Sequence, residues 1–427
     1  MPATAANLLE TMRYTYAQPE QVLYLFNQES VSFNMLKKHQ KPVGGRGQFI
    51  MPIMVQNAGA WTGIAEGGSL PSTLAPDSAE ATWSLVEFVG LVDLTWKLIQ
   101  DSNSSKFAFK QGLKTVEDSF RRRIARNVNM DLIGDGLGKL GIMSGADNQT
   151  TITFRALPGC DQGMVVDLVD ASDDNTKLSD SVTVNAINVE TNEVTFSGSA
   201  PSGTAAGDYI VIQDTVTSTV SRHTHGLLGI FDNANPPASK GNVGSINRST
   251  SGNEYWEAAV FSNSGGNRAL TEDLLLRAED MVRIKGGGKL NAYLSNNAIL
   301  RRYHELVKED VFFAMGKPSA LDSGVGLGRS GGSEANKDGK TIYRFSGVPW
   351  HVDPYFDSNR VLAFDTSHVF IGHGDNETPM PESEVFPGRP FFRQTSSATY
   401  EVAFYWQGEL ISDAPSAGAV IEDLLES

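Results

Sequence analysis

Alternating apolar and polar positions predict a long β-hairpin between residues 48 and 85. The outgoing strand is expected over residues 48–55 and the returning strand over 79–85, where small or apolar side chains alternate with polar ones. Residues 59–76 between them are rich in Gly, Ser, Pro and Thr and offer little apolar material for a core. The edges of such a hairpin invite pairing with another chain. We therefore expect residues 48–85 to project and to gain their stability only by lying across another copy.

The most periodic segment of the chain predicts one long helix over residues 106–133. At 1.5 Å per residue this helix would be about 40 Å long. Ser104 and Ser105 are candidate N-caps, and the glycines after Ile133 are a candidate stop. Apolar residues at spacings of three and four form one stripe: Leu113, Val116, Phe120, Ile124, Val128 and Leu132.

The opposite face of this helix is expected to carry four arginines: Arg121, Arg122, Arg123 and Arg126. Two interpretations carry equal weight. The arginines form a solvent-exposed face, or they contact acidic surfaces of neighbouring copies. A contact with DNA ranks third because the chain as a whole is acidic.

Later segments alternate between strand-rich and mixed patterns. Strands are predicted over 182–189, 194–196 and 207–212, within a strand-and-turn region from 151 to about 221. A helix capped by Thr271 and a second helix capped by Ser295 enclose a strand over 291–294. Residues 316–340 predict an exposed Gly- and Ser-rich loop, and strands dominate after it.

Composition narrows the function classes. The 427 residues suffice for two or three domains with substantial cores. A net charge of −15 argues against a nucleic-acid binder, since phosphate contacts need Lys and Arg gathered on one face. The single Cys160 excludes an intramolecular disulfide, and we expect a buried or incidental thiol. Neither a signal peptide nor an apolar run of about 20 residues is recognised, so no membrane association is expected.

Motifs that would carry catalysis are missing from the sequence. Residues 134–139 lack the first Gly of a P-loop, and Leu140 stands where Ser or Thr is needed. Neither a nucleophile elbow nor a His-Glu-x-x-His motif occurs. We expect no enzyme activity, no cofactor, and no catalytic, cofactor-binding or metal-binding residue.

Two groups of residues are candidate metal ligands, but structural roles are favoured for both. The pair His223 and His225 has no third ligand at a diagnostic distance. The second group lacks the spacing and glycine of a calcium loop: Asp170, Asp173, Asp174 and Asp180.

The order of elements resembles the major capsid proteins of tailed bacteriophages with the HK-97-like fold. The hairpin, the polar step over 101–105 and the long helix ending at 133–141 carry this resemblance. Gly347-Val-Pro349, Asp353 and Asp365-Thr-Ser367 continue it. The resemblance covers nearly the whole chain except about 151–221. It further implies a short strand at 226–231, followed by a turn around Arg248 that returns the chain to the core.

The resemblance implies an α+β, HK-97-like capsid fold. Its parts would be a peripheral domain with a long spine helix and a β-sheet, an axial α/β domain, an extended β-hairpin loop, an N-terminal arm and an inserted small β-barrel-like domain. The expected boundaries are 1–40 for the arm, which would dock on neighbours, 41–99 for the extended loop, 100–150 for the spine helix, 151–222 for the insert, 223–262 for the return to the peripheral domain, 263–345 for the axial domain, and 346–427 for peripheral and axial strands with the C-terminus.

By resemblance, the chain is expected to self-assemble into hexamers and pentamers of an icosahedral phage head enclosing double-stranded DNA, which it contacts non-specifically. The implied partners are portal, scaffold and decoration proteins, and the implied location is the virion, assembled in the host cytoplasm. An encapsulin-like protein nanocompartment is the alternative. A β-rich extracellular enzyme or adhesin would need a secretion signal and a catalytic set, and neither is visible.

Part of this family forms an isopeptide bond between a lysine on the extended loop and an asparagine of a neighbour. The sequence has no lysine from Pro42 to Trp96. We therefore expect no such cross-link.

Overall fold

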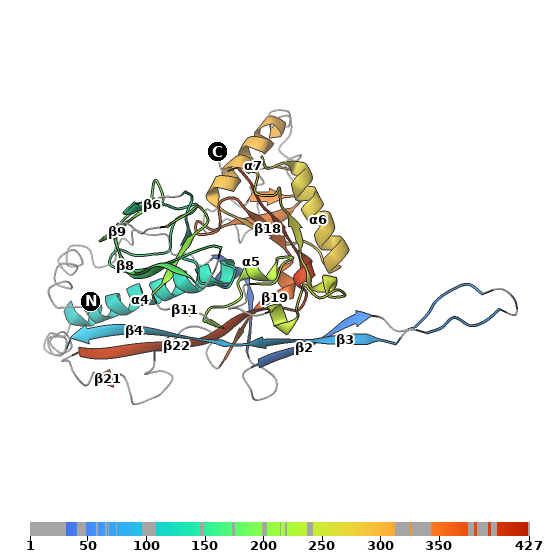
Figure 1. The fold of residues 1–427 in the computed structure, drawn as a ribbon, viewed down its shortest axis with the longest axis horizontal. Coiled ribbons are helices and arrows are strands. Elements are labelled where there is room, and N and C mark those ends of the chain that lie inside the picture. The colour runs from blue at the N-terminus through green and yellow to red at the C-terminus, as the bar shows by residue number, and fades with distance from the viewer. Residues whose placement is uncertain are drawn as a thin grey trace.

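A long β-ribbon runs along one side of the molecule and continues beyond it as a projecting hairpin (Figure 1). The structure is a computed structural model. It describes residues 31–40, 48–56, 59–64, 66, 68–73, 75–95, 108–145, 149–172, 176–198, 203–213, 215–217, 220–236, 242–311, 325–326, 343–374, 380–381, 392–393 and 399–425.

The predicted hairpin is confirmed. Strands β2 (Gln48–Gln56) and β3 (Asp77–Ser84) pair antiparallel, with a bulge between Met54 and Gln56. The chain passes from β3 through Leu85 into β4 (Val86–Thr95), so hairpin and ribbon are continuous.

The ribbon, meaning the paired strands β4 and β22, belongs to a six-stranded sheet. β4 pairs antiparallel along all its 10 residues with β22 (Thr399–Ser412). The other members of this sheet are β1 (Lys37–Gln40), β19 (Val369–His373), β20 (Met380–Pro381) and β21 (Phe392–Arg393).

The predicted spine helix is confirmed as α4 (Ala108–Ile133), which packs on the ribbon. The rings of Phe120 and Phe404 lie 5.2 Å apart. Gly90 makes room for this contact, because a Cβ there would lie 2.9 Å from the Phe120 ring. In the apolar stripe Val128 and Leu132 are buried, whereas the side chains of Leu113 and Val116, and the candidate caps Ser104 and Ser105, lie outside the described residues.

A second six-stranded sheet lies beside α4 (Figure 1). Its order is β5-β10-β7-β8-β9-β6. The end strands are joined by backbone hydrogen bonds, from Ser144 N to Thr153 O (3.0 Å) and from Arg155 N to Ile142 O (2.9 Å). The strands are β5 (Gly141–Ile142), β6 (Thr151–Thr153), β7 (Val165–Val169), β8 (Lys177–Asn188), β9 (Glu193–Ser197) and β10 (Tyr209–Ile212).

The predicted strands over 182–189, 194–196 and 207–212 correspond to β8, β9 and β10. The interior of this sheet and the buried side of α4 share one hydrophobic core, which includes Val128, Leu132, Ile152 and Val166. A short pair, β11 (Val216–Thr217) with β12 (Val220–Ser221), follows.

The third large sheet has seven strands and a core of its own. The helices α6 (Glu272–Gly286) and α7 (Asn297–Val311) lie beside it (Figure 1). The Trp350 ring stacks between Tyr293 (5.1 Å) and Tyr303 (4.8 Å). The strand order is β13 (Ala259–Phe261), β23 (Gly418–Ile421), β18 (Val361–Phe364), β14 (Ala292–Ser295), β17 (Val348–Val352), β16 (Tyr343–Phe345) and β15 (Val325–Gly326).

One of the two predicted caps is confirmed. Thr271 Oγ1 accepts a hydrogen bond from Leu274 N (3.4 Å) at the start of α6. Ser295 does not cap α7, because its hydroxyl accepts from Trp350 Nε1 (2.7 Å) and it ends β14. Asn296 takes that role, and its Oδ1 accepts from Ala298 N (3.1 Å).

The expected strand at 226–231 is wrong: these residues contain the short helix α5 (Leu227–Ile230). The carbonyl of Gly134, at the end of α4, accepts from Leu228 N (3.1 Å) and Gly229 N (3.3 Å). Contacts from α4 therefore favour a helical turn here. The short helix α2 (Val31–Met35) precedes β1. The described elements also include four 3-10 helices: η1 (Val243–Ser245), η2 (Glu254–Trp256), η4 (Thr366–His368) and η5 (Pro415–Ala417).

Candidate assembly surface

The stem of the hairpin, meaning β2 and β3, packs on its own molecule. Trp83 and Ala81 are fully buried, and the Phe49 ring meets Phe370 at 6.2 Å. Gly244 lies beneath Trp83 with a positive φ of 60°, and a Cβ there would lie 3.2 Å from the indole. The expectation that the whole limb gains stability only from another copy is therefore wrong for the stem.

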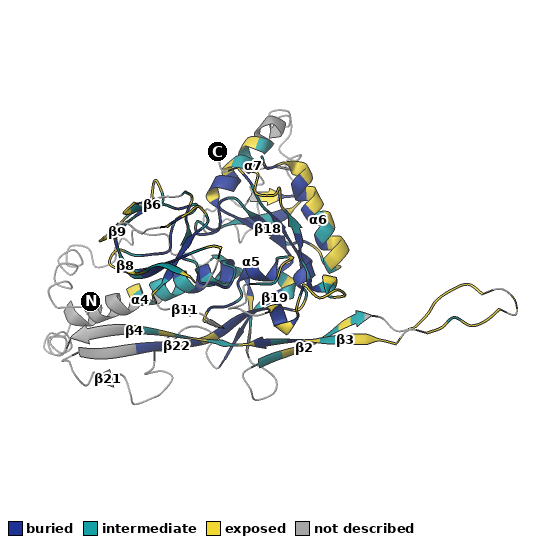
Figure 2. Ribbon diagram, in the orientation of Figure 1, coloured by how far each residue is buried: buried dark blue, intermediate teal, exposed yellow. Residues whose placement is uncertain are grey.

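The tip of the hairpin, defined as residues 59–73, has a different character. Its large apolar side chains are exposed: Trp61 by 101%, Leu70 by 83% and Ile64 by 54%. The tip extends away from the body as an exposed loop (Figure 2). Projecting apolar side chains of this size are typical of a surface that another protein covers.

The outer edge of β2 is poorly suited to accept a further strand. Pro52, in the middle of β2, has no N–H to donate, and the bulge after Met54 disturbs the strand. The face of β2 that points away from the core is apolar, since Ile50 is exposed by 46% and Met54 by 65%. The geometry favours contact through side chains over strand addition.

The expected N-terminal arm is described only from residue 31, and residues 31–40 pack within their own molecule. Ser32 N donates to Asn129 Oδ1 (3.1 Å), and Asn129 Nδ2 donates to Asp353 Oδ2 (2.6 Å). Burial raises the pKa of Asp353. β1 then pairs in parallel with β19. Residues 31–40 therefore belong to the packed body of their own molecule, and residues 1–30 of the expected arm lie outside the described residues.

The arginine face of α4 is not a uniform solvent-exposed face. Arg126 is 4% exposed and forms a two-point ion pair with Asp161, in the loop before β7. Arg123 Nε also approaches Asp161, at 3.4 Å. Both interpretations of Arg126, as a solvated residue and as a contact for neighbours, are wrong. The side chain of Arg121 lies outside the described residues.

Another arginine, Arg248, holds the return segment together. It is 3% exposed and donates to the carbonyls of Trp256 (3.1 Å), Ala234 (3.0 Å) and Gly229 (3.3 Å), and also to that of Ile230. Burial lowers the pKa of Arg248 to about 10. The expected turn around Arg248 is thus stabilised by one buried guanidinium.

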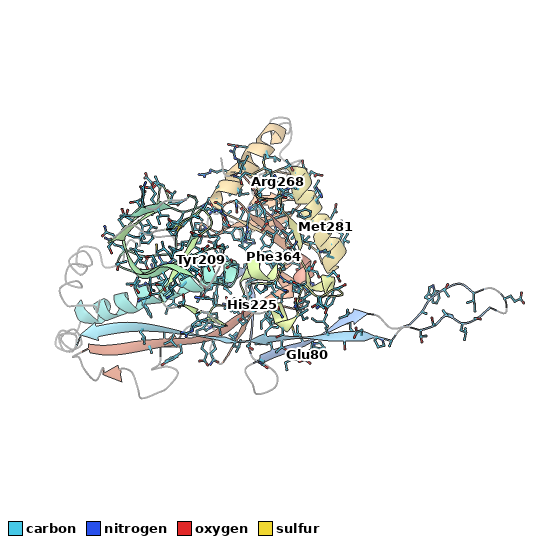
Figure 3. The ribbon with its side chains drawn as sticks, viewed as in Figure 1. Glu80, Tyr209, His225, Arg268, Met281 and Phe364 are labelled. Carbon is cyan, nitrogen blue, oxygen red and sulfur yellow. The ribbon has the colours of Figure 1, made fainter. Side chains whose placement is uncertain are left out.

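The two candidate histidines contact different carboxylates. His223 Nδ1 lies 3.0 Å from Asp131 of α4, and His225 Nδ1 lies 3.3 Å from Glu409 of β22. The His225 ring also packs edge-on against Trp83 (5.2 Å). Figure 3 places His225 where the ribbon meets the body. Each histidine links elements of the fold, and the pair does not converge on one point.

The remaining candidate ligands lie apart. Asp170 Oδ1 accepts from Ser172 N (2.7 Å), and Asp180 pairs with Lys177 (3.1 Å), whereas Asp173 and Asp174 lie outside the described residues. Among the residues described, no group of three His, Cys, Asp or Glu side chains could hold a metal. Cys160 is buried and free, and burial raises its pKa to about 12.

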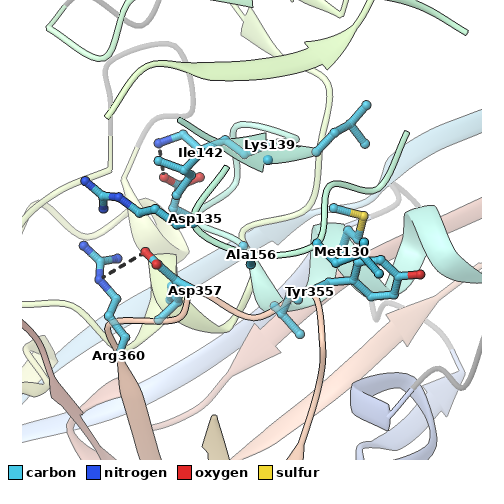
Figure 4. A pocket seen from close by; sticks show the side chains of 15 residues that line it. Met130, Asp135, Lys139, Ile142, Ala156, Tyr355, Asp357 and Arg360 are labelled. Carbon is cyan, nitrogen blue, oxygen red and sulfur yellow. Dashed lines mark ion pairs between the residues drawn. The ribbon is translucent and has the colours of Figure 1, made fainter. Parts of the chain in front are cut away.

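A small cavity of about 60 Å³ lies where the end of α4 meets the 155–157 turn and the loop after β17 (Figure 4). Two ion pairs lie in its lining, Asp135 with Lys139 at 2.6 Å and Arg360 with Asp357 at 3.8 Å. Burial opposes ionisation of Asp135, but Lys139 outweighs it and lowers the pKa of Asp135. The described lining contains no Ser, Cys or His. None of the described helices is long and apolar enough to span a membrane.

Comparison with known proteins identifies the fold. No protein-family model and no curated protein matches this chain. The capsid asymmetric unit of Cyanophage A-1(L) is similar over 95% of this chain and 96% of that chain, with 12% sequence identity and a TM-score of 0.53. The chain therefore has the HK-97-like α+β fold of phage capsid proteins, as the sequence resemblance predicted.

Weaker likenesses were found to two further structures. One is from Mycobacterium phage Cain (11% identity, 99% and 98% of the two chains covered, TM-score 0.44). The other is the SrpI encapsulin complex of Synechococcus elongatus (11% identity, 97% and 96% covered, TM-score 0.43).

Sequence reasoning missed the apolar side chains at the tip. Residues 59–76 were expected to carry little apolar material, yet Trp61, Ile64 and Leu70 are large apolar side chains exposed to solvent. The available signal was the presence of four large apolar residues, Trp61, Ile64, Leu70 and Leu74, in a segment whose Gly, Ser and Pro content excludes a core of its own.

Proposed function

We propose that this chain is the major capsid protein of a tailed bacteriophage, which assembles into hexamers and pentamers of an icosahedral head around double-stranded DNA. The observation that carries the proposal is the hairpin tip, where Trp61 is exposed by 101% on a limb that projects from a capsid fold. Burying a large apolar side chain gains about 1.5–3 kcal/mol. In a closed shell, the tip of each subunit would be buried against a neighbouring copy, so this gain would recur at every subunit.

The charge of the chain fits such a container. A net charge of −15 is compatible with a shell that encloses DNA, because an acidic inner wall would not trap the polymer, and the proposed DNA contacts are non-specific. Portal, scaffold and decoration proteins are the partners that such a shell requires or accepts. The virion is the proposed location, with assembly in the host cytoplasm. The protein acts as a structural subunit and not as an enzyme.

Expression of the chain followed by negative-stain microscopy tests the proposal. We expect closed shells or capsomer-sized rings. A protein that stays monomeric at high concentration, with its hairpin folded against its own body, would overturn the proposal. The encapsulin-like alternative is tested on particles recovered from their natural source. Nuclease-protected DNA supports the phage head, whereas an enclosed enzyme identified by mass spectrometry supports the compartment.

A further inference from the structure

One rung of the hairpin stem rests on two glycines of the body. Phe49 of β2 and Trp83 of β3 lie directly opposite each other in the ladder, so both side chains lie on the same face of the stem. Gly244 lies under Trp83, and an added Cβ there would be 3.2 Å from the indole. Gly372 of β19 lies under Phe49, and an added Cβ there would be 2.7 Å from the phenyl ring. We call Gly244 and Gly372 the glycine seat.

A third contact lies one rung further towards the tip. Ala81 is fully buried, and a Cβ on Gly244 would lie 3.2 Å from the Ala81 Cβ. Phe49 and Trp83 support the stem across its width, whereas Ala81 and Trp83 support it over about 7 Å of its length. Three contacts that do not lie on one line fix both the tilt and the roll of a rigid pair of strands. The glycine seat is thus placed to orient the stem.

The segment that carries Gly244 is itself held to the body and to the stem. Trp256 Nε1 donates to Val243 O (2.8 Å), and Ser245 Oγ donates to Thr82 O (3.1 Å) in β3. Gly244 has a φ of 60°, a left-handed conformation that glycine adopts without the steric cost of a side chain. An added Cβ would also lie 3.1 Å from the Trp256 ring, so the body leaves no free space on the other side.

The hairpin magnifies any displacement at the glycine seat. The chain is fixed again at Val86, where β4 starts its pairing with β22. Trp83 and Leu70 lie about 10 Å and about 50 Å from Val86 along extended chain, so a shift at Trp83 grows about fivefold at Leu70. A Cβ on Gly244 that moves Trp83 by a few tenths of an ångström would therefore move the tip by about 2 Å.

We propose that Gly244 is a positioning residue: the space that it leaves under Trp83 sets the angle at which the hairpin leaves the body, and that angle sets the curvature of the shell (Figure 1). This inference rests on the proposed function, because a projecting limb that contacts a neighbouring copy also decides how that copy is inclined. Subunits with one hairpin angle assemble into particles of one size, whereas subunits with a range of angles do not.

The distance from the tip to the body tests the first half of the proposal in dilute, unassembled subunits. Spin labels are attached at Ser69→Cys and Asp280→Cys, while the buried Cys160 stays unlabelled. We expect one narrow distance distribution for the parent, and Gly244→Ala should shift its mean by about 2 Å or widen it. Gly287→Ala is the matched control. Gly287 has a φ of 61° and nothing within 4 Å of an added Cβ, so this variant strains the backbone without crowding the seat and should leave the distribution unchanged.

Particle diameters measured by electron microscopy test the second half. Gly244→Ala should give a wider range of diameters or open shells, whereas Gly287→Ala should give the parent's diameters. Phe49→Leu replaces Gly244→Ala if that variant does not fold. It removes the ring contact with Phe370 and loosens the seat without crowding it, so we expect a broadened tip distance and a wider range of diameters.

The outcomes separate this inference from the capsid proposal. A broad tip distance in the parent subunit, or equal effects of Gly244→Ala and Gly287→Ala, would overturn the role of the seat. A displaced tip with unchanged particle diameters would overturn the link to curvature. Each of these results leaves the capsid proposal standing. Failure of the unmodified chain to form particles would overturn the capsid proposal, whereas distances in the free subunit would still decide whether the seat orients the hairpin.

Discussion

Arg126 of α4, which is buried, and Asp161 of the loop before β7, which is partly exposed, form a two-point ion pair, with Nη1–Oδ1 at 2.8 Å and Nη2–Oδ2 at 2.5 Å. Burial disfavours the charged guanidinium, but the hydrogen bonds and charge of Asp161 outweigh it and raise the pKa of Arg126. The pair fastens the spine helix to the six-stranded sheet beside it.

Removing one partner of this pair should destabilise the subunit. Asp161→Asn leaves the Arg126 charge buried without a counter-charge, which should lower the free energy of unfolding by about 2–4 kcal/mol. This loss is smaller than for a fully buried pair because Asp161 is partly exposed. Urea unfolding of the unassembled subunit measures the loss. Asp180→Asn is the matched control: Asp180 is 65% exposed in its pair with Lys177, so a change below about 0.5 kcal/mol is expected. Equal losses in the two variants would contradict this account.

Asp135 should contribute to acid sensitivity. Its pKa in the folded protein is lowered below 3.8, chiefly by Lys139 against the effect of burial. The unfolded chain therefore binds the proton more readily, and the stabilisation is present above pH 3.8 and is lost as pH falls through the lowered pKa. Asp135→Asn should be less stable at pH 7 and should lose less stability on acidification. Unfolding free energies measured from pH 7 to below 3.8 check this, and parallel curves for the two proteins would refute it.

Two tryptophans of the hairpin should show opposite phenotypes. Trp61→Ser, at the exposed tip, should leave subunit stability within about 0.5 kcal/mol of the parent but abolish or strongly weaken assembly. Trp83→Ala, in the buried stem, should cost about 3–5 kcal/mol of subunit stability. Thermal unfolding and light scattering separate the two effects. Normal assembly of the Trp61→Ser variant would show that the tip does not anchor one copy on another.

Denatured particles should migrate as single chains. The hairpin and the ribbon up to Trp96 offer no lysine amine for an isopeptide bond. Electrophoresis under denaturing, reducing conditions should show one band near 46 kDa, whereas particles treated with a chemical cross-linker should show a ladder. A ladder of covalently linked chains in untreated particles would contradict this prediction.

Local patterns explain which elements the sequence could predict. The alternation in β2 and β3 and the stripe from Phe120 to Leu132 lie within single elements, so periodicity finds them. The burial of Arg126 could not be read this way, because Asp161 lies 35 positions away. The helical turn at Leu227 likewise depends on the carbonyl of Gly134, far back in the chain.

The candidate surface was predicted in part. The position of the projecting hairpin followed from its strand pattern, but the division into a packed stem and an exposed tip did not. That division depends on Phe370 and Gly244, which meet Phe49 and Trp83 only in the folded molecule.

The docked stem has a consequence for the kinetics of association. Because Trp83 is anchored before any partner arrives, the direction of the limb is set in the free monomer. Binding then needs to order only the loop beyond the strands, which reduces the conformational entropy lost in each encounter. In the proposed shell, newly made subunits would thus join a growing edge quickly without first refolding.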